Sequence, residues 1–582
     1  MSFAVFNAIF LFDVVKQELR RPGLLLVSEF SWWLLELLEQ LFAVIVIVFF
    51  EFGRASWARL VIWCLLDRVL LEPIEPITNR FFRDIVAFSQ RIDIVALFAT
   101  NCSKDSFTRN FSLCLLAHFV ELLQSDIVQP AHIFGSVYYG KYFRTTVAMI
   151  YARGQPEDYD HWAELGNNGW AFEDVLPYFK RAEHNERGSS AYHGTGGPRH
   201  VADLQAPNEL SEVFVEAGQA VGLPHNEDFN AGEQAGVGLY QVTQKNGTRH
   251  SAADAYLKPV LERSNLTVTT GAQVTQVRFD GQNAVGVEYV RDDTGSTETV
   301  DATTEVILSA GTINSPQLLM LSGVGPAAHL NNHGIPVVHD LPGVGRNLQD
   351  HLQVKLNYAC EKPISLASAD SLWNLVKYLV LKRGPLTSNV AEAGGFTSVS
   401  EETERPDIQL HFGPSYSVNH GFDNPDGHGF WLGALCLRPE SRGRLTLRSA
   451  DPFDEPAIDP RYLTDKADRE ILLDGLKLIR EILQAEPFDA YRGRELLPGS
   501  DARSDGELIE HLRETAHSLY HPVGTCKMGD DEMAVVDDRL AVHGVDGLRV
   551  VDASIMPTIT SGNTDAPTTM IAEKAADYIL DP

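Results

Sequence analysis

The stretch EVILSAGTINSPQLLMLSGVG at residues 305–325 combines an apolar run, a turn of small residues and a helix-like segment. Its first part, EVILSAG (305–311), predicts a buried strand. Ser315 and Pro316 predict the N-cap and first residue of a following helix. A strand that passes through small residues into a helix N-terminus is a geometry that admits a phosphate-bearing ligand at the carboxyl end of the strand.

A glycine motif nearby has the spacing of a dinucleotide-binding fingerprint but not its context. Residues Gly323 to Ala328 satisfy G-x-G-x-x-G/A, yet they follow a predicted helix and have Pro326 at the fourth position. We interpret them as a turn that ends the helix. The chain contains no other match to this fingerprint.

Six motifs, taken together, resemble those of the glucose-methanol-choline (GMC) flavin oxidoreductases and occur in that family's order. The branch that they resemble most is the choline-dehydrogenase-like alcohol dehydrogenases, and the resemblance covers residues 148–582. The motifs are AMIYARGQPEDYDHW (148–162), GTINSPQLLMLSGVG (311–325), LPGVGRNLQDH (341–351), YHPVGTCKMG (520–529), RVVDASIMP (549–557) and SGNTDAPTTMIAEKAAD (561–577).

The resemblance implies a catalytic pair and FAD as the cofactor. Oxidation of an alcohol needs a base near neutral pKa, and the family pattern places it at His521, where Pro522 and Gly524 restrict the backbone. Asn563 takes the second position, where its amide holds the substrate oxygen beside the flavin. The alternatives are that His521 is one of many structural histidines and that Asn563 caps the next helix.

Further flavin contacts are implied at Val274, at Asp552 and Ala553, and at Asn563 itself. Val274 is also explained as an ordinary strand valine. His351 is expected to have a structural role. Asp565 stands where the family commonly has Asn, and its charge would disfavour a reduced anionic flavin unless it points to solvent.

These residues are positioned by a predicted α/β fold. It comprises a Rossmann-like FAD-binding domain and a substrate domain built on an antiparallel sheet. Residues 148–351 are expected to belong to the FAD-binding domain and residues 352–515 to the substrate domain. The chain then returns to the FAD-binding domain with residues 516–582. Within the first segment, alternating residues at 266–270, 273–279 and 284–290 predict a small antiparallel meander with an Asp-Gly turn at 280–281.

The first 147 residues differ from the rest in composition. They hold 18 of the 29 phenylalanines but only 4 of the 45 glycines, and their net charge is −1 against −30 for the whole chain. The family's glycine-rich fingerprint and flavin-covering loop are both absent from them. We interpret the segment as the product of a frameshifted or mis-joined reading frame, or as a replaced N-terminal domain, and expect weak or absent flavin binding if nothing replaces those loops.

Charge and apolar content also bear on partners and location. The acidic balance disfavours nucleic acid, and with only 14 lysines it suggests a halophilic source, the alternative being an ordinary acidic cytosolic enzyme. The apolar window 32–50 contains Glu36 and Glu39, which favours a buried element over a membrane span. No signal peptide or cysteine pattern for a disulfide framework or zinc is present, so we expect a cytoplasmic protein, with membrane association less favoured, and no metal.

The leading functional hypothesis is an FAD-dependent alcohol dehydrogenase that passes electrons from a small alcohol to a separate acceptor. An oxidase that uses oxygen is one alternative. A second is a lyase of the hydroxynitrile type that keeps flavin as structure, and a third is a flavin-free or inactive remnant. The alcohol, the natural acceptor and the oligomeric state do not follow from the sequence.

Overall fold

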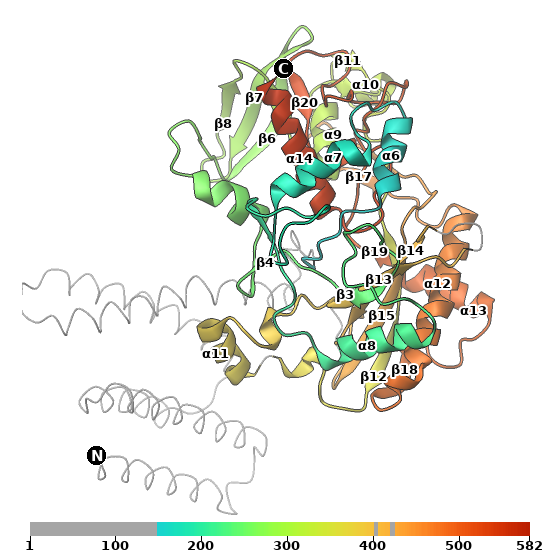
Figure 1. Ribbon diagram of the computed structural model, residues 1–582. Helices are drawn as coiled ribbons and strands as arrows, with labels where there is room; N and C mark the ends of the chain where they lie inside the picture. Colours follow the sequence, from blue (N-terminus) through green and yellow to red (C-terminus); the bar gives the residue numbers. More distant parts are fainter. Residues whose placement is uncertain (1–147, 370, 401–404, 419–424, 582) are drawn as a thin grey trace, which may run out of the picture. The chain divides into compact units, whose positions relative to one another are not determined.

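The computed structural model describes residues 148–369, 371–400, 405–418 and 425–581 (Figure 1). The predictions made for residues 1–147, namely the membrane window and the missing cofactor loops, lie outside these ranges. Across the described part of the chain, no helix combines the length and the apolar character needed to cross a bilayer.

The larger of the two main sheets is antiparallel throughout and has the strand order β18-β12-β15-β14-β13-β3, with β19 also paired to β12. Two of its strands, β3 and β19, come from outside the predicted segment 352–515. The strands are β3 (Gly236–Leu239), β12 (Leu352–Cys360), β13 (Ala393–Thr397), β14 (Ile408–Gly413), β15 (Gly429–Cys436), β18 (Arg492–Leu497) and β19 (His517–Ser518).

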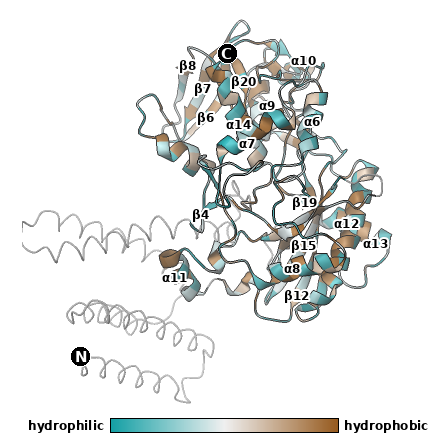
Figure 2. Ribbon diagram, viewed as in Figure 1, coloured by the Kyte–Doolittle hydropathy of each residue, from teal (hydrophilic) through white to brown (hydrophobic). Residues whose placement is uncertain are grey.

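The two faces of this sheet differ in polarity because β12 and β14 alternate apolar and polar residues. The apolar face packs against α8 (Glu209–Ala220) and α12 (Lys466–Gln484), and α13 (Asp505–Thr515) lies against α12 (Figure 1). The ribbon of α12 accordingly alternates between hydrophobic and hydrophilic colours (Figure 2). The opposite face of the sheet carries glutamine, lysine and histidine side chains.

The predicted meander is confirmed for two of its three segments. Strands β6 (Ala272–Asp280), β7 (Asn283–Arg291) and β8 (Thr297–Asp301) form an antiparallel sheet, and Gly281 turns the first hairpin with φ of +62°. The strand predicted at 266–270 is wrong. That segment is largely exposed, and because no described strand lies beside it, its backbone has no ladder to join.

A parallel strand pair forms the α/β part of the fold. Strand β9 (Val306–Leu308), predicted from EVILSAG, pairs with β20 (Leu548–Val550), and each is followed by a helical turn, α9 (Gly311–Leu321) and η7 (Ala553–Ile555). With α6 (Pro156–Glu164), α7 (Phe172–Ala182) and α14 (Asp565–Leu580), these elements share one apolar core. The predicted fold class is confirmed for the described residues.

Helix α9 begins earlier than predicted, at Gly311, so Ser315 and Pro316 lie inside it. The local cap is replaced by a distant one, because Asp552 Oδ2 accepts hydrogen bonds from the Gly311 N–H (2.9 Å) and the Ser315 hydroxyl (2.5 Å). Pro316 has no N–H for the carbonyl of Thr312, which instead accepts the hydroxyl of Thr525 at 2.6 Å. A proline is tolerated here because another segment supplies the missing donor.

The turn after α9 agrees with its prediction as a helix end. Gly323 has φ of +88° and donates its N–H to the carbonyl of Met320. The remaining elements of the described residues are short: α10 (Ala327–Asn332), α11 (Leu372–Leu381), β1 (Glu183–Asn185), β2 (Arg199–Val201), β4 (Gln244–Lys245), β5 (Thr248–Arg249), β10 (Val324–Gly325), β11 (His339–Asp340), β16 (Arg444–Thr446) and β17 (Ala457–Asp459).

Candidate active site

His521 lies in a loop that is held on two sides. Its backbone N–H donates to Asp350 Oδ1 at 2.9 Å. The next carbonyl, of Pro522, accepts the hydroxyl of Thr312 on α9 at 2.7 Å. With 5% of its surface exposed, the His521 side chain is buried, and its backbone is restrained by contacts to both the sheet segment and the α9 segment.

A second histidine fixes which nitrogen of His521 carries the proton. His351 Nε2 lies 3.0 Å from the carbonyl of Leu437, and a carbonyl only accepts, so this nitrogen is protonated. In the neutral ring His351 Nδ1 is then an acceptor, and it lies 3.0 Å from His521 Nδ1. His521 therefore donates from Nδ1, which leaves the lone pair on its Nε2.

Both rings are neutral at physiological pH. Burial lowers the pKa of His351 to about 4. Burial also lowers the pKa of His521 well below its ordinary value, and the nearby rings of His351 and His411 add to this effect. His521 can thus accept a proton at neutral pH without first losing one.

Asn563 faces the free nitrogen of His521. Its Nδ2 lies 3.1 Å from His521 Nε2, and its Oδ1 accepts from Gln409 Nε2 at 3.3 Å. The side chain is 3% exposed. The residue at the N-cap of α14 is Thr564 and not Asn563, so the alternative interpretation of Asn563 as a helix cap does not hold.

The predicted flavin contacts fall in two places. Asp552 follows β20 and caps α9, and Ala553 accepts the backbone N–H of Gly524 in the His521 loop at 3.3 Å. The structure thus brings Asp552 and Ala553 to the His521 loop. Val274 lies on β6, half-buried against the core of the parallel strand pair, on a separate sheet.

The charge of Asp565 has a partner. Its Oδ2 lies 2.6 Å from the guanidinium of Arg199, a side chain that is 6% exposed. An ion pair this close offsets the negative charge that the sequence placed beside the flavin position. Asp565 is therefore not an uncompensated charge, and its side chain is 29% exposed.

Sequence reasoning missed the polar face of the large sheet, which contacts Asn563 through Gln409. Gln409 contacts both Asn563 and the hydroxyl of Tyr240, and Gln353 Nε2 lies 3.4 Å from His411 Nδ1. The available signal was the strict alternation of polar and apolar residues in strands that are buried on both faces, IQLHFG (408–413) above all.

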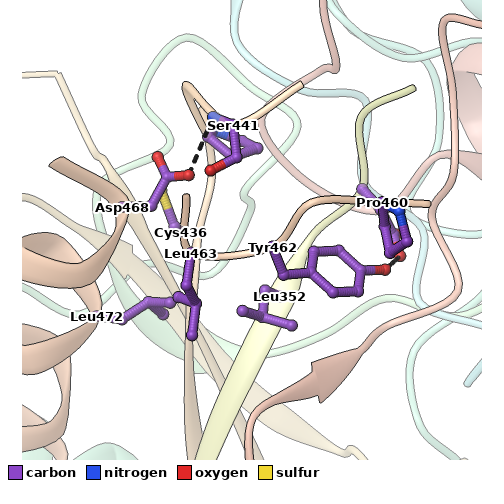
Figure 3. A pocket seen from close by; sticks show the side chains of 10 residues that line it. Leu352, Cys436, Ser441, Pro460, Tyr462, Leu463, Asp468 and Leu472 are labelled. Carbon is purple, nitrogen blue, oxygen red and sulfur yellow. Dashed lines mark hydrogen bonds between the residues drawn. The ribbon is translucent and has the colours of Figure 1, made fainter. Parts of the chain in front are cut away.

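The small pocket of Figure 3 lies on the other side of Asp350 and is not the site itself. Its volume is about 10 Å³, too small for any alcohol. Tyr462 lines it and donates its hydroxyl to Asp350 Oδ2, while Asp468 accepts the N–H of Ser441 at 3.0 Å. The residues around this pocket position Asp350, and Asp350 in turn accepts the backbone N–H of His521.

Comparison with known proteins agrees with this geometry. Two family models described as GMC oxidoreductase match residues 145–353 and 439–572. An alcohol dehydrogenase (acceptor) of Pseudomonas putida is 47% identical over 439 residues, covering 74% of this chain and 80% of the relative. An oxygen-dependent choline dehydrogenase of Pseudomonas savastanoi pv. phaseolicola is 47% identical over 438 residues, covering 74% and 77%.

Solved structures that superpose on this chain include flavin-dependent enzymes. Pyridoxine 4-oxidase from Mesorbium loti superposes with a TM-score of 0.68 at 34% identity, covering 75% of this chain and 82% of that chain. An FAD-dependent oxidoreductase from Chaetomium thermophilum superposes with a TM-score of 0.68 at 28% identity, covering 74% and 84%. By its sequence motifs, its fold and the extent of these matches, the chain belongs to the GMC oxidoreductase family.

Proposed function

We propose that the chain oxidises the CH–OH group of an alcohol by hydride transfer to FAD, and that the electrons then pass to a separate acceptor. The observation that carries the proposal is the lone pair on His521 Nε2, which is buried beside an amide and held in that tautomer by His351. Removal of an alcohol proton requires a base that is unprotonated at the working pH, and this lone pair meets that condition.

His521 and Asn563 divide the work on the substrate oxygen. Their facing nitrogens are 3.1 Å apart, so one oxygen atom at hydrogen-bond distance can contact both. His521 Nε2 accepts the hydroxyl proton, and Asn563 Nδ2 donates to the oxygen and restrains its direction. The positive charge that forms on His521 is stabilised by His351 Nδ1, which accepts the Nδ1–H more strongly once the ring is charged.

Residues on the flavin side support FAD as the cofactor, which when bound would supply the hydride acceptor. Gly311 has φ of +81°, and a Cβ added there would meet nothing within 4 Å, so the carboxyl end of β9 is open to a ligand. Arg199 has buried Nε and Nη1 atoms without partners, which offers donors to an acceptor atom of the cofactor. Ala553 would present its backbone amide at the end of β20.

The test is anaerobic reduction of FAD by a primary alcohol in the full chain and in the variant His521→Gln. We expect the variant to keep its bound flavin, seen by visible absorption, and to reduce it roughly 10²–10⁴-fold more slowly, because a general base contributes about that factor. The matched control is His161→Gln, whose side chain is 47% exposed and lies outside the site.

Each alternative has its own outcome in this experiment. A change of less than about threefold in His521→Gln would contradict the role of His521 as the base. A lyase would keep its flavin oxidised with every alcohol, and a flavin-free remnant would stay colourless after incubation with FAD. Oxygen uptake during turnover would show that the electron acceptor is oxygen and not a separate molecule.

A further inference from the structure

The polar face of the large sheet carries a lysine whose ammonium contacts a hydroxyl and an aromatic ring. Lys355 on β12 places its Nζ 3.0 Å from the hydroxyl of Ser417 and 4.3 Å from the centre of the Trp431 ring. Within the described ranges no carboxylate lies at ion-pair distance from it. Burial lowers the pKa of Lys355 to about 7, as expected for an ammonium with no acidic neighbour.

The register of the sheet places this lysine on the catalytic side. Lys355 pairs with Gly433 on β15, and Gly433 pairs in turn with His411 on β14, so the three residues form one row on one face. Gly433 has no side chain, and the side chain of Gln353 lies over it, where an added Cβ would meet Gln353 Nε2 at 2.6 Å. The neighbouring row contains Gln409, which contacts Asn563.

The same face holds buried polar atoms that have no partner. They are Gln353 Oε1, Gln409 Oε1, His411 Nε2 and Trp431 Nε1. Buried polar groups are nearly always hydrogen-bonded, so four unpaired ones on the face that contacts Asn563 through Gln409 indicate a surface that meets a ligand. Such a ligand would have polar groups that pair with these atoms, and the charged side chain that it would meet on this face is Lys355.

We infer that Lys355 makes this face reject cationic alcohols, so that the substrate is an uncharged or anionic alcohol and not a quaternary ammonium alcohol such as choline. The inference rests on the proposed function. Recognition of a quaternary ammonium group uses the faces of aromatic rings or a carboxylate. Here the Lys355 ammonium already lies over the ring of Trp431, and a second cation would meet repulsion in place of attraction.

The inference separates two relatives that are equally similar to the chain. The alcohol dehydrogenase and the choline dehydrogenase are each 47% identical to it, so overall similarity does not choose between their substrates. A single charge does. Repulsion between two unit charges at a partly buried site corresponds to roughly ten- to a hundredfold in kcat/KM.

The experiment compares choline with 3,3-dimethylbutan-1-ol, which has the same shape but carbon in place of the charged nitrogen. The full chain is reconstituted with FAD and assayed at pH 6.5, where Lys355 is largely protonated. We expect kcat/KM to favour the neutral alcohol about ten- to a hundredfold. Lys355→Met, which keeps the apolar stem, should bring the ratio toward one by improving choline, and Lys355→Arg should preserve it.

Controls and binding measurements keep the result interpretable. Lys466→Met changes a side chain that is 76% exposed and should leave the ratio unchanged. Calorimetric titration of both alcohols into the same proteins gives a readout that does not need turnover. If neither alcohol reduces flavin, the proposed function fails and the calorimetry alone decides this inference. Equal or tighter binding of choline, a ratio unmoved in Lys355→Met, or no binding of either alcohol would overturn it.

Discussion

Replacing His351 tests whether this residue sets the tautomer of His521. In His351→Leu the acceptor of the His521 Nδ1–H disappears, whereas in His351→Asn the Oδ1 atom takes roughly the position of Nδ1 and still accepts. Both variants lose the bond to the Leu437 carbonyl. Both variants therefore share that loss of stability, and they differ in whether residue 351 has an acceptor for the His521 Nδ1–H.

The expected magnitude follows from burial. A buried donor left without an acceptor costs about 1–3 kcal/mol. His521 can avoid that cost by moving its proton from Nδ1 to Nε2, where Asn563 accepts it once the amide turns its Oδ1 toward the ring; the proton then occupies the nitrogen that should act as base. The productive tautomer then falls by roughly 5- to 150-fold, and the rate of proton removal falls with it.

The assay is anaerobic flavin reduction followed by stopped-flow absorption at saturating alcohol. We expect His351→Leu to lower the limiting rate by that factor with little change in KM, and His351→Asn to recover most of the loss. A purely structural role would give both variants the same defect. Equal rates in the two variants, or a loss confined to KM, would refute the tautomer argument.

Three further predictions concern stability, each measured by urea denaturation. Thr525→Val leaves the Thr312 carbonyl opposite Pro316 without its donor and should lower the free energy of unfolding by about 1–3 kcal/mol; a change below about 0.5 would contradict this. Unfolded histidines protonate near pH 6.5, but burial lowers the pKa of His351 to about 4 and of His411 to about 3. The unfolded state then binds more protons, so stability should fall by on the order of 2–4 kcal/mol from pH 6.5 to 5, and no fall would refute it. With a net charge of −30, the chain should unfold at higher urea in 2 M than in about 0.1 M KCl; an unchanged midpoint would argue against the halophilic hypothesis.

The parts of the fold that could be predicted from the sequence are those decided locally. The β6–β7 hairpin is marked by alternation and an Asp-Gly turn, and the turn at Gly323 by its place after an apolar helix. The strand at 266–270 and the start of α9 were wrong for a different reason. A strand exists only beside a partner, and the cap of α9 is Asp552, more than two hundred residues away.

The site divides in the same way. His521 and Asn563 could be named because long motifs around them resemble a known family, and the structure then places their nitrogens 3.1 Å apart. Gln409 and Lys355 lie outside those motifs. Their alternation with apolar residues is visible in the sequence, but which face of the sheet meets the catalytic loop depends on where α8 and α12 pack. Only the three-dimensional arrangement supplies that information.

The proton-handling part of the proposed reaction is complete within the described residues. His351 is the last residue of the predicted first segment of the fold, Gln409 lies on the large sheet, and His521 and Asn563 come from the C-terminal segment, so three distant stretches meet around the His521–Asn563 pair. The family resemblance would place the glycine-rich pyrophosphate loops before residue 148, where this sequence lacks them. Base and cofactor binding are therefore separable by experiment: a chain that binds alcohol by calorimetry yet stays colourless with FAD has lost the hydride acceptor and kept the proton acceptor.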